Sequence, residues 1–212
     1  MKWGVLVGGQ GTNLRALLEA GIEVVVVVSH RQGVGALDIA ARWGVPAIVL
    51  LPRDYPDRAA YGEALRSILA DYRVEAVALA GFLRWLDPKT VAAYKNRILN
   101  VHPSLLPAFP GLDGVDQALA GGVRWTGVTV HVVDEGHDTG PIVAQCPVPV
   151  APDDDPSRLA ARVHAVEHRL FPAVVKAFDA GLIRVDGRRV EVAGAAGAFP
   201  DHFLWGGGEA KQ

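Results

Sequence analysis

The sequence predicts an α/β fold built on a doubly wound, mostly parallel sheet with antiparallel strands at its edge. In the first hundred residues, short apolar runs alternate with segments whose apolar residues recur at helical spacing. These runs are rich in Val, Ile and Leu, which is typical of parallel strands buried on both faces. After Pro107 the pattern changes to longer segments that alternate in polarity. The combination indicates right-handed crossovers and a Rossmann-like arrangement.

The first half of the chain contains the pattern of five strands and four helices. The strands are predicted at Trp3–Val7, Val24–Val28, Ala47–Leu51, Ala76–Ala80 and Ile98–Leu99. The helices are predicted at about 13–20, 35–43, 58–71 and 88–95. Gly44 is placed to end the second helix, and Asp87-Pro88 to begin the fourth, because Pro suits the first turn of a helix.

The second half begins with a loop at 108–114 and a short helix at 115–120 that ends at Gly121-Gly122. Residues 127–133 alternate in polarity as a strand does. Residues 142–150 form a second strand, and Pro147 and Pro149 place it at a sheet edge because Pro cannot donate to a ladder.

A long helix and a hairpin complete the predicted fold. Three aspartates and Pro156 mark the start of the helix. Its buried stripe is predicted to contain Leu159, Val163, Val166, Leu170 and Val174. Strands at 183–185 and 189–192 flank Asp186-Gly187 and form the hairpin. Residues 194–212 are rich in Gly and Ala, and we expect a poorly ordered tail there.

Composition narrows the possible functions. The 212 residues are 50% hydrophobic, enough to bury a full core. The formal net charge of −2 argues against a nucleic-acid or membrane-surface partner, and no apolar run is long enough to span a bilayer. Trp3 already starts a strand pattern, so we expect no signal peptide. Cys146 is the single cysteine, which fits a reducing cytoplasm.

The strongest chemical signal lies where the fifth strand ends. Asn100 and His102 are two residues apart, so both side chains project from the same face of an extended strand. Polar side chains at the carboxyl end of a parallel strand are typical of an α/β active site. Asp138 supplies a carboxylate from the Gly-rich loop 134–141 between two apolar runs. These three residues are candidates for catalysis.

A second signal is the turn Gly8-Gly9-Gln10-Gly11-Thr12-Asn13 between the first strand and first helix. Glycines allow the backbone to approach an anion, and a helix N-terminus presents N–H groups to it. The dinucleotide fingerprint fits poorly, because Leu14 stands where its third glycine belongs. The trio Ser29-His30-Arg31 could suit a 2′-phosphate, so an NADP-dependent oxidoreductase stays open as an alternative.

The long helix contains the pattern His164-Ala165-Val166-Glu167-His168, which matches inverted zinc peptidases. Two histidines four residues apart share a helical face and can coordinate a zinc ion. No third ligand stands out downstream, and both histidines border the buried stripe. We therefore expect no metal site.

Several segments together resemble the folate-dependent formyltransferases, in particular the glycinamide ribonucleotide formyltransferase family of purine synthesis. The segments are 9–14, 80–84 (Ala-Gly-Phe-Leu-Arg), 100–107 (Asn-Val-His-Pro-Ser-Leu-Leu-Pro) and 138–141 (Asp-Thr-Gly-Pro), in family order. The third segment by itself marks the wider group that uses 10-formyltetrahydrofolate, so a deformylase or another amine acceptor stays open. The resemblance implies the formyltransferase fold, with residues 1–193 as one domain. In it, 1–100 would be the phosphate-binding half and 101–193 the folate and catalytic part.

The resemblance also implies roles for individual residues. Gly11, Thr12 and Asn13 would hold the substrate phosphate, and Glu167 would meet the sugar hydroxyls. The co-substrate 10-formyltetrahydrofolate would be held by the set Arg58, Leu83, Arg84, Trp85, Leu86 and Asn100. The partners would be these two small molecules, acting on a monomer or homodimer, with no metal.

Two positions depart from the family pattern. Asp113 stands where the family usually has His, which puts a substrate contact in question and leaves open a binding protein without turnover. His30 stands where the family usually has Asn, and there we expect only a change in loop packing.

The expected chemistry explains the residue types. An amine attacks the formyl carbon, and an oxyanion develops that Asn100 can stabilise by about 3 kcal/mol. His102 can donate to the same oxygen and move a proton. We expect Asp138 to raise the pKa of His102 and to keep the imidazole charged near neutral pH.

Overall fold

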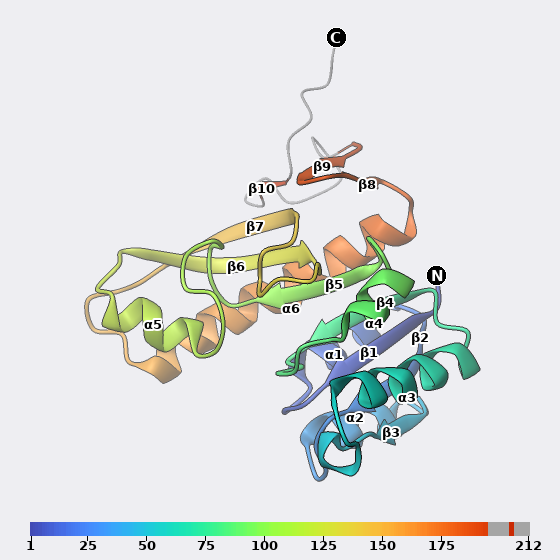
Figure 1. Ribbon diagram of the computed structural model, residues 1–212. Coiled ribbons are helices and arrows are strands. Elements are labelled where there is room, and N and C mark those ends of the chain that lie inside the picture. Colours follow the sequence, from blue (N-terminus) through green and yellow to red (C-terminus); the bar gives the residue numbers. More distant parts are fainter. Residues whose placement is uncertain (195–203, 206–212) are drawn as a thin grey trace. The chain divides into compact units, whose positions relative to one another are not determined.

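A computed structural model describes residues 1–194 and the strand at 204–205 (Figure 1). The chain forms two compact units, each described by itself below. The N-terminal unit comprises Met1–Asn100 and Val133–Glu135. The C-terminal unit comprises Val101–Val132 and the described residues from Gly136 onward.

The strands of the N-terminal unit are parallel and follow the spatial order β5-β4-β1-β2-β3. They are β1 (Trp3–Val7), β2 (Val24–Ser29), β3 (Ala47–Val49), β4 (Ala76–Ala80) and β5 (Ile98–His102), the last two residues of β5 belonging to the other unit. The helices are α1 (Thr12–Glu19), α2 (Gly35–Arg42), α3 (Arg58–Asp71) and α4 (Pro88–Ala93), with a 3₁₀ turn η1 (Pro52–Asp54). The predicted alternation of strands and helices is confirmed.

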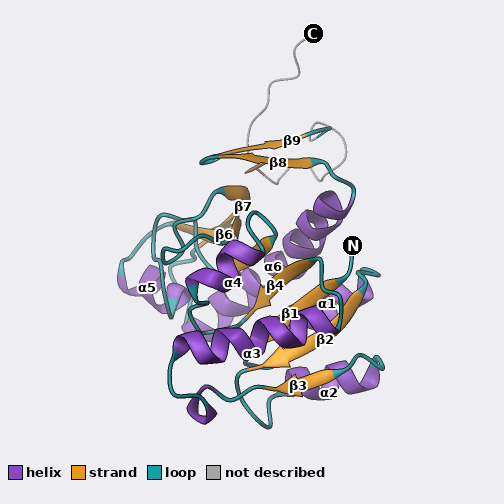
Figure 2. Cartoon of the chain, turned by 45° about the vertical axis from the view of Figure 1, so that its right-hand side comes forward, coloured by secondary structure: helices purple, strands orange, loops and turns teal. Residues whose placement is uncertain are grey.

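Strand register explains the core on one face of these strands. Leu6 of β1 lies beside Val28 of β2 and Leu79 of β4. All three are buried and pack in one cluster with Leu65 and Leu69 of α3. Figure 2 shows α3 in front of these strands and α1 behind them. Since side chains alternate along a strand, each face of the strands receives its own helix layer.

Strand β3 differs from its prediction. It covers Ala47–Val49 only, and Ala47 and Val49 are exposed while Ile48 is half-buried. The prediction of a longer strand buried on both faces is wrong because β3 ends the strand order and pairs only with β2 in the described part of the chain. An edge strand lacks the second neighbour that buries a central one.

The C-terminal unit has the predicted antiparallel strands. Its elements are α5 (Gly114–Ala120), β6 (Trp125–Val132), β7 (Ile142–Pro149), α6 (Pro156–Asp179), β8 (Ile183–Asp186), β9 (Arg189–Val192) and β10 (Leu204–Trp205). Strand β7 pairs with β6 on one side and, among the described residues, with β10 at Ala144 and Gln145 on the other. The prediction that the two prolines place this strand at the sheet edge is wrong, because β10 lies outside β7 in the strand order; the described pairing uses Ala144 and Gln145 and not Pro147 or Pro149. Strands β8 and β9 form a separate hairpin.

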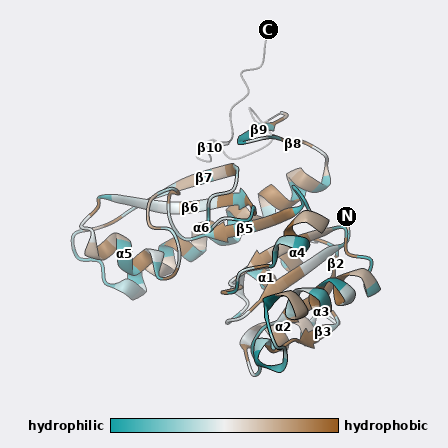
Figure 3. Cartoon of the chain, viewed as in Figure 1, coloured by the Kyte–Doolittle hydropathy of each residue, from teal (hydrophilic) through white to brown (hydrophobic). Residues whose placement is uncertain are grey.

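Helix α6 begins as its sequence predicts. The Asp155 side chain caps it by accepting a hydrogen bond from the Arg158 N–H at 2.8 Å. The stripe is buried except at Val166, which is half-buried, and Glu167 beside it is 4% exposed. Figure 3 shows hydrophobic and hydrophilic segments side by side along this helix. A glutamate therefore occupies a position that the pattern assigned to the edge of the core.

The tail predicted at 194–212 lies outside the described residues apart from Gly194 and β10. Within the described ranges, no helix combines the length and apolarity needed to cross a membrane.

Candidate active site

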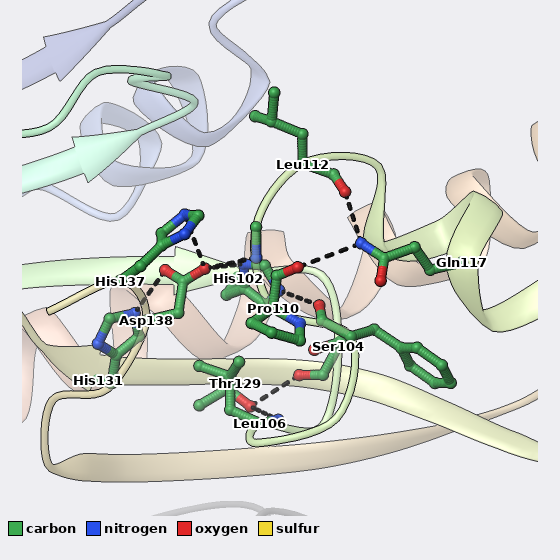
Figure 4. A network of polar contacts seen from close by, with 12 residues as sticks. His102, Ser104, Leu106, Pro110, Leu112, Gln117, Thr129, His131, His137 and Asp138 are labelled. Carbon is green, nitrogen blue, oxygen red and sulfur yellow. Dashed lines mark hydrogen bonds and ion pairs between the residues drawn. The ribbon is translucent and has the colours of Figure 1, made fainter.

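The carboxylate of Asp138 is the centre of a polar cluster in the C-terminal unit (Figure 4). Its Oδ2 lies 3.5 Å from Nδ1 of His102 and 3.6 Å from Nε2 of His137. Its Oδ1 lies 3.6 Å from Nε2 of His131. The His102 and Asp138 side chains are 5% and 11% exposed, so the expected pair is formed and largely shielded from water.

Local backbone geometry directs Asp138 into this cluster. The residue has a positive φ of 53° in the loop between β6 and β7. Gly136 lies two residues earlier, and a Cβ there would lie 2.0 Å from Oγ1 of Thr139, so another residue would require the Thr139 side chain to move. The backbone N–H of Gly111 donates to Oδ2 of Asp138 at 2.9 Å. The Gly-rich loop thus aims a side chain, as its sequence predicts.

The other side of the His102 ring faces a backbone carbonyl. Nε2 of His102 lies 2.8 Å from the Phe109 oxygen and donates its proton there. Two bonds hold the following loop in place, since Nε2 of Gln117 donates to the carbonyls of Pro110 and Leu112 at 3.2 and 2.7 Å. The loop therefore fixes the plane of the imidazole.

Residues after His102 are anchored to the antiparallel strands. Oγ1 of Thr129 donates to the Ser104 carbonyl at 2.7 Å and accepts from the Leu106 N–H at 3.0 Å. The Ser104 hydroxyl donates to the Ala108 carbonyl at 2.5 Å. These bonds give Ser104, which the sequence presents beside the histidine, a role in shaping the loop.

Asp138 is held in its ionised form. Burial by itself would raise the pKa of its carboxyl group. Hydrogen bonding from His131 and Gly111 and the positive charge on His102 and His131 outweigh burial and lower the pKa to about 2. Asp138 is therefore a fixed negative charge across the physiological pH range.

The pKa of His102 is lowered, and the expectation that Asp138 would raise it is wrong in its net direction. Burial disfavours the charged imidazolium and is the largest cause. The Phe109 hydrogen bond and the charge of Asp138 act in the opposite direction, while His131 and His137 add to the lowering. His102 is consequently neutral at pH 7 and able to accept a proton.

Asn100 is half-buried on β5, two residues before His102, and it is the last residue of the N-terminal unit before β5 continues. It pairs with Leu79 of β4 in the parallel ladder. The strand is extended through both residues, which is the condition for the two side chains to share a face.

The glycine-rich turn of the N-terminal unit leads directly into α1. Gly11 is the N-cap with a φ of 78°, and its carbonyl accepts the first helical bond from Arg15 at 2.9 Å. A Cβ at Gly11 would lie 2.6 Å from Cα of Ala36, so no other residue fits without a shift. Thr12 and Asn13 are the first helical residues. The predicted anion-binding residues therefore stand at a helix N-terminus.

His30 packs beneath this turn. Its ring is buried, its Nδ1 donates to the Val7 carbonyl at 3.0 Å, and its edge meets the Phe82 ring at 4.9 Å. A Cβ on Gly8 would overlap the imidazole, so the glycine makes room for it. Burial is the largest cause that lowers the pKa of His30, which leaves the ring neutral at pH 7.

A pocket of about 440 Å³ lies within the N-terminal unit. Its lining includes four residues of the expected folate set, and the full lining is Pro52, Tyr55, Pro56, Asp57, Arg58, Tyr61, Leu83, Arg84 and Trp85. The Tyr61 hydroxyl is buried without a hydrogen-bond partner in the described part of the chain, and burial raises its pKa to about 12. Leu83 and Trp85 are more than half exposed, so apolar surface borders the opening.

Two predicted site residues, Leu86 and Glu167, lie outside this pocket lining, as does Asp113, the departure from the family pattern. Leu86 does not line this pocket and packs against the hydrophobic core. Glu167 is buried on α6 in the other unit. Asp113 is the exposed N-cap residue of α5 with a φ of 60°, and its side chain does not cap the helix.

The zinc alternative has a partial geometric basis. The rings of His164 and His168 are stacked with centroids 6.3 Å apart. Among the described residues, no three His, Cys, Asp or Glu side chains form a group able to hold a metal ion.

Sequence reasoning missed several parts of the two sites. His131 and His137 contact Asp138, and Tyr55 and Tyr61 line the pocket. The sequence could have indicated His131, since it is a polar residue that alternates with Val130 and Val132 along a strand. The Phe109 carbonyl and the Gly111 N–H had none, because every residue has such groups.

A buried imidazole beside a carboxylate at a strand end, on an α/β scaffold with a glycine-rich turn, indicates a group-transfer enzyme that uses acid–base chemistry. The chain belongs to the formyl transferase family, whose family model matches residues 1–175.

Known proteins resemble the chain along most of its length. It is 44% identical over 188 residues to a phosphoribosylglycinamide formyltransferase of Mycobacterium tuberculosis, covering 87% of each chain. It is 43% identical over 188 residues to a trifunctional purine biosynthetic protein adenosine-3 of Drosophila pseudoobscura pseudoobscura, covering 85% of this chain. The chain spans only 14% of that much longer relative.

A solved structure has the same fold. The crystal structure of glycinamide ribonucleotide transformylase 1 from Symbiobacterium toebii is 44% identical, with a TM-score of 0.88 over 91% of this chain and 93% of that one. This match confirms the predicted formyltransferase fold with its mostly parallel sheet.

Proposed function

We propose that this protein transfers a formyl group from 10-formyltetrahydrofolate to the amine of glycinamide ribonucleotide in purine biosynthesis. The observation that carries the proposal is the His102–Asp138 pair, with 3.5 Å between Nδ1 and Oδ2, at the end of a strand that also bears Asn100. The formyl transferase family match and the relatives named above support the reaction.

The pocket of the N-terminal unit is assigned to the folate. Its chemistry fits a flat heteroaromatic acid, because Trp85, Tyr55 and Tyr61 offer aromatic surface while Arg58 and Arg84 offer positive charge. The buried Tyr61 hydroxyl adds a polar group without a partner in the described residues. Leu86 supports this wall from the core side, and Leu83 lies at its rim.

The helix N-terminus at Gly11, Thr12 and Asn13 is assigned to the phosphate of the ribonucleotide. N–H groups of a first helical turn have no partner within their helix, and the helix dipole favours an anion there. Glu167 is assigned to the sugar hydroxyls, since a carboxylate accepts hydrogen bonds from two neighbouring hydroxyl groups.

His102 begins the reaction as a neutral base, in keeping with its lowered pKa. The folate supplies the formyl carbon on its nitrogen N10. As the amine nitrogen bonds to that carbon, Nδ1 of His102 accepts the amine proton, because Nε2 already carries the proton donated to the Phe109 carbonyl, and Asp138 stabilises the imidazolium that forms. The Asn100 amide donates to the developing oxyanion. When the bond from carbon to N10 breaks, His102 returns the proton to N10, so one proton moves from the amine to the leaving nitrogen.

The proposed roles of the site residues also imply a domain organisation for the chain. Residues 1–193 act as one formyltransferase domain, with the phosphate-binding half in 1–100 and the catalytic pair in 101–193. Because the pocket assigned to the folate is lined by residues between Pro52 and Trp85, we propose that most folate contacts come from the first half. We assign a cytoplasmic location, supported by the single cysteine, and small-molecule partners, supported by the low net charge. We propose a monomer or homodimer.

One experiment tests the reaction. Purified protein is mixed with 10-formyltetrahydrofolate, with and without glycinamide ribonucleotide, and folate absorbance and the mass of the ribonucleotide are followed. We expect tetrahydrofolate and a formylated ribonucleotide only when both substrates are present. Release of formate without the ribonucleotide would instead indicate a deformylase. Absence of both products, together with stabilisation by NADP, would favour the oxidoreductase alternative.

A further inference from the structure

A buried ionic cluster joins α3 to the start of α4 within the N-terminal unit. Asp87 is 4% exposed, and Nη1 of Arg66 donates to its Oδ1 and Oδ2 at 2.9 and 3.0 Å. The same Nη1 lies 2.9 Å from Oγ1 of Thr90, and the Thr90 hydroxyl donates to Oδ2 of Asp87. As N-cap of α4, Asp87 also accepts from the backbone N–H groups of Lys89 and Thr90.

The cluster keeps the Asp87 carboxylate ionised although it is buried. Burial would raise the pKa of Asp87, but the hydrogen bonds from Thr90 and Arg66 and the charge of Arg66 outweigh it, and the pKa is lowered. A buried ion pair of this kind is weak evidence for stability, because desolvation offsets much of the attraction. The position of the Arg66–Asp87 ion pair in the fold is therefore a better guide to its role than its contribution to stability.

Asp87 lies just after a segment that lines the pocket, residues 83–85, which we call the wall segment. Segment 83–85 lines the pocket, and Asp87 follows it after one intervening residue, Leu86. At the other end of the segment, Phe82 is buried and packs edge-on against His30 at 4.9 Å. The wall segment, with its exposed residues, thus lies between two buried residues, Phe82 and Asp87.

Helix α3 contributes residues to the pocket lining and also binds Asp87 through Arg66. Arg58 and Tyr61 line the pocket from its first turn, and Arg66 lies on the same helix. Between them, Gly62 is buried, and a Cβ there would lie 1.8 Å from Oδ2 of Asp87. Glycine inside a helix reduces stability relative to alanine. Its presence here matches the close approach of Asp87 to the helix backbone.

We propose that Arg66, Asp87 and Thr90, with Gly62 as the contact point, are positioning residues that set the distance between α3 and segment 83–86 and thereby the affinity for the folate co-substrate. The proposal rests on the assignment of this pocket to the folate. None of these side chains lines the pocket, so they act through Arg58, Tyr61 and the wall segment.

The first test uses Gly62→Ala, which removes no polar group. Helix propensity predicts a stabilised helix, whereas the overlap with Asp87 predicts a displaced wall. We expect the Michaelis constant for 10-formyltetrahydrofolate to rise by about tenfold or more, because small displacements at a binding wall have large effects. The turnover number at saturating folate and the Michaelis constant for the ribonucleotide should stay within about twofold.

The second test removes the ion pair. Arg66→Ala should raise the folate Michaelis constant in the same way, and Arg66→Lys should restore part of the affinity because it keeps the charge. Glu63→Ala is the matched control, since Glu63 is exposed on the same helix and does not line the pocket. Thermal melting of every variant identifies loss of folding separately from loss of affinity.

Trp85→Ala tests the assignment of the pocket to folate separately from the positioning role, because Trp85 lines the pocket directly. If Trp85→Ala raises the folate constant while Gly62→Ala and Arg66→Ala only lower the melting temperature, the positioning role is wrong and the pocket assignment stands. If none of the three changes the folate constant, the pocket does not bind folate and both inferences are overturned. A rise in the folate constant for all three, with partial rescue by Arg66→Lys, supports the proposal.

Discussion

Replacing Asp138 with Asn removes the charge at the centre of the histidine cluster and keeps the size of the side chain. The carboxyl group has a pKa of about 2 in the folded protein, against an ordinary value of 3.8. This difference corresponds to about 2 kcal/mol of stabilisation of the ionised form. The side chain is 11% exposed, so solvent screens the interaction little. We expect Asp138→Asn to lose about 2 kcal/mol of unfolding free energy at pH 7.

The sign of the pH dependence follows from the lowered pKa. Between pH values of about 4 and 2 the unfolded chain binds more protons than the folded protein at this site, so the stabilisation is present above 3.8 and is lost as pH falls through about 2. Urea unfolding of wild type and variant at pH 7, 5, 4 and 3 measures the difference. A stability difference that stays constant over this range would refute the account of Asp138 as a stabilised anion.

The same variant tests catalysis. Turnover should fall by about two to four orders of magnitude if the carboxylate and imidazole act as one unit, with little change in ribonucleotide binding. The pKa of His102, measured by NMR of its ring signals, should fall further because Asp138 is one of the groups that raise it. Asp134→Asn is the control, since it changes an acid at the start of the same loop. Impaired turnover in the control with normal turnover in Asp138→Asn would show that the carboxylate is misassigned.

Four further variants test the remaining assignments. Asn13→Asp should raise the Michaelis constant for the ribonucleotide far more than for folate, because it places like charge near the phosphate; equal effects would contradict the assignment. Arg58→Ala should weaken folate binding by less than about tenfold, and the effect should shrink in high salt, because Arg58 is exposed; unchanged affinity would leave it a solvated arginine. Gly11→Ala should lower stability by about 1 kcal/mol or more in urea unfolding, given its φ of 78° and the contact with Ala36, and a neutral effect would contradict the geometry. His30→Asn should reduce the loss of melting temperature between pH 7 and 5, because a buried imidazole with a lowered pKa protonates first in the unfolded chain; an unchanged slope would contradict this.

Local sequence pattern determined most of the fold and the chemical type of the site. Val-rich runs predicted the central strands, and the comparisons confirm the fold and the family, whereas the sheet edge predicted from Pro147 and Pro149 is wrong because β10 lies outside β7. These features are local because the period of apolar residues reports which faces are buried. The same reasoning placed Asn100 and His102 on one strand and identified Asp138 as the carboxylate.

Tertiary structure alone decided how these groups behave. The contact of Asp138 with the Gly111 N–H joins residues 27 positions apart in the chain, and backbone groups carry no sequence signature. The pKa of His102 was predicted in the wrong direction because desolvation depends on everything that surrounds a ring, whereas the sequence displayed only its partner. The burial of Ala47 and Val49 was mispredicted for a related reason, since a strand's place in the sheet order is set by packing of the whole unit and not by its own residues.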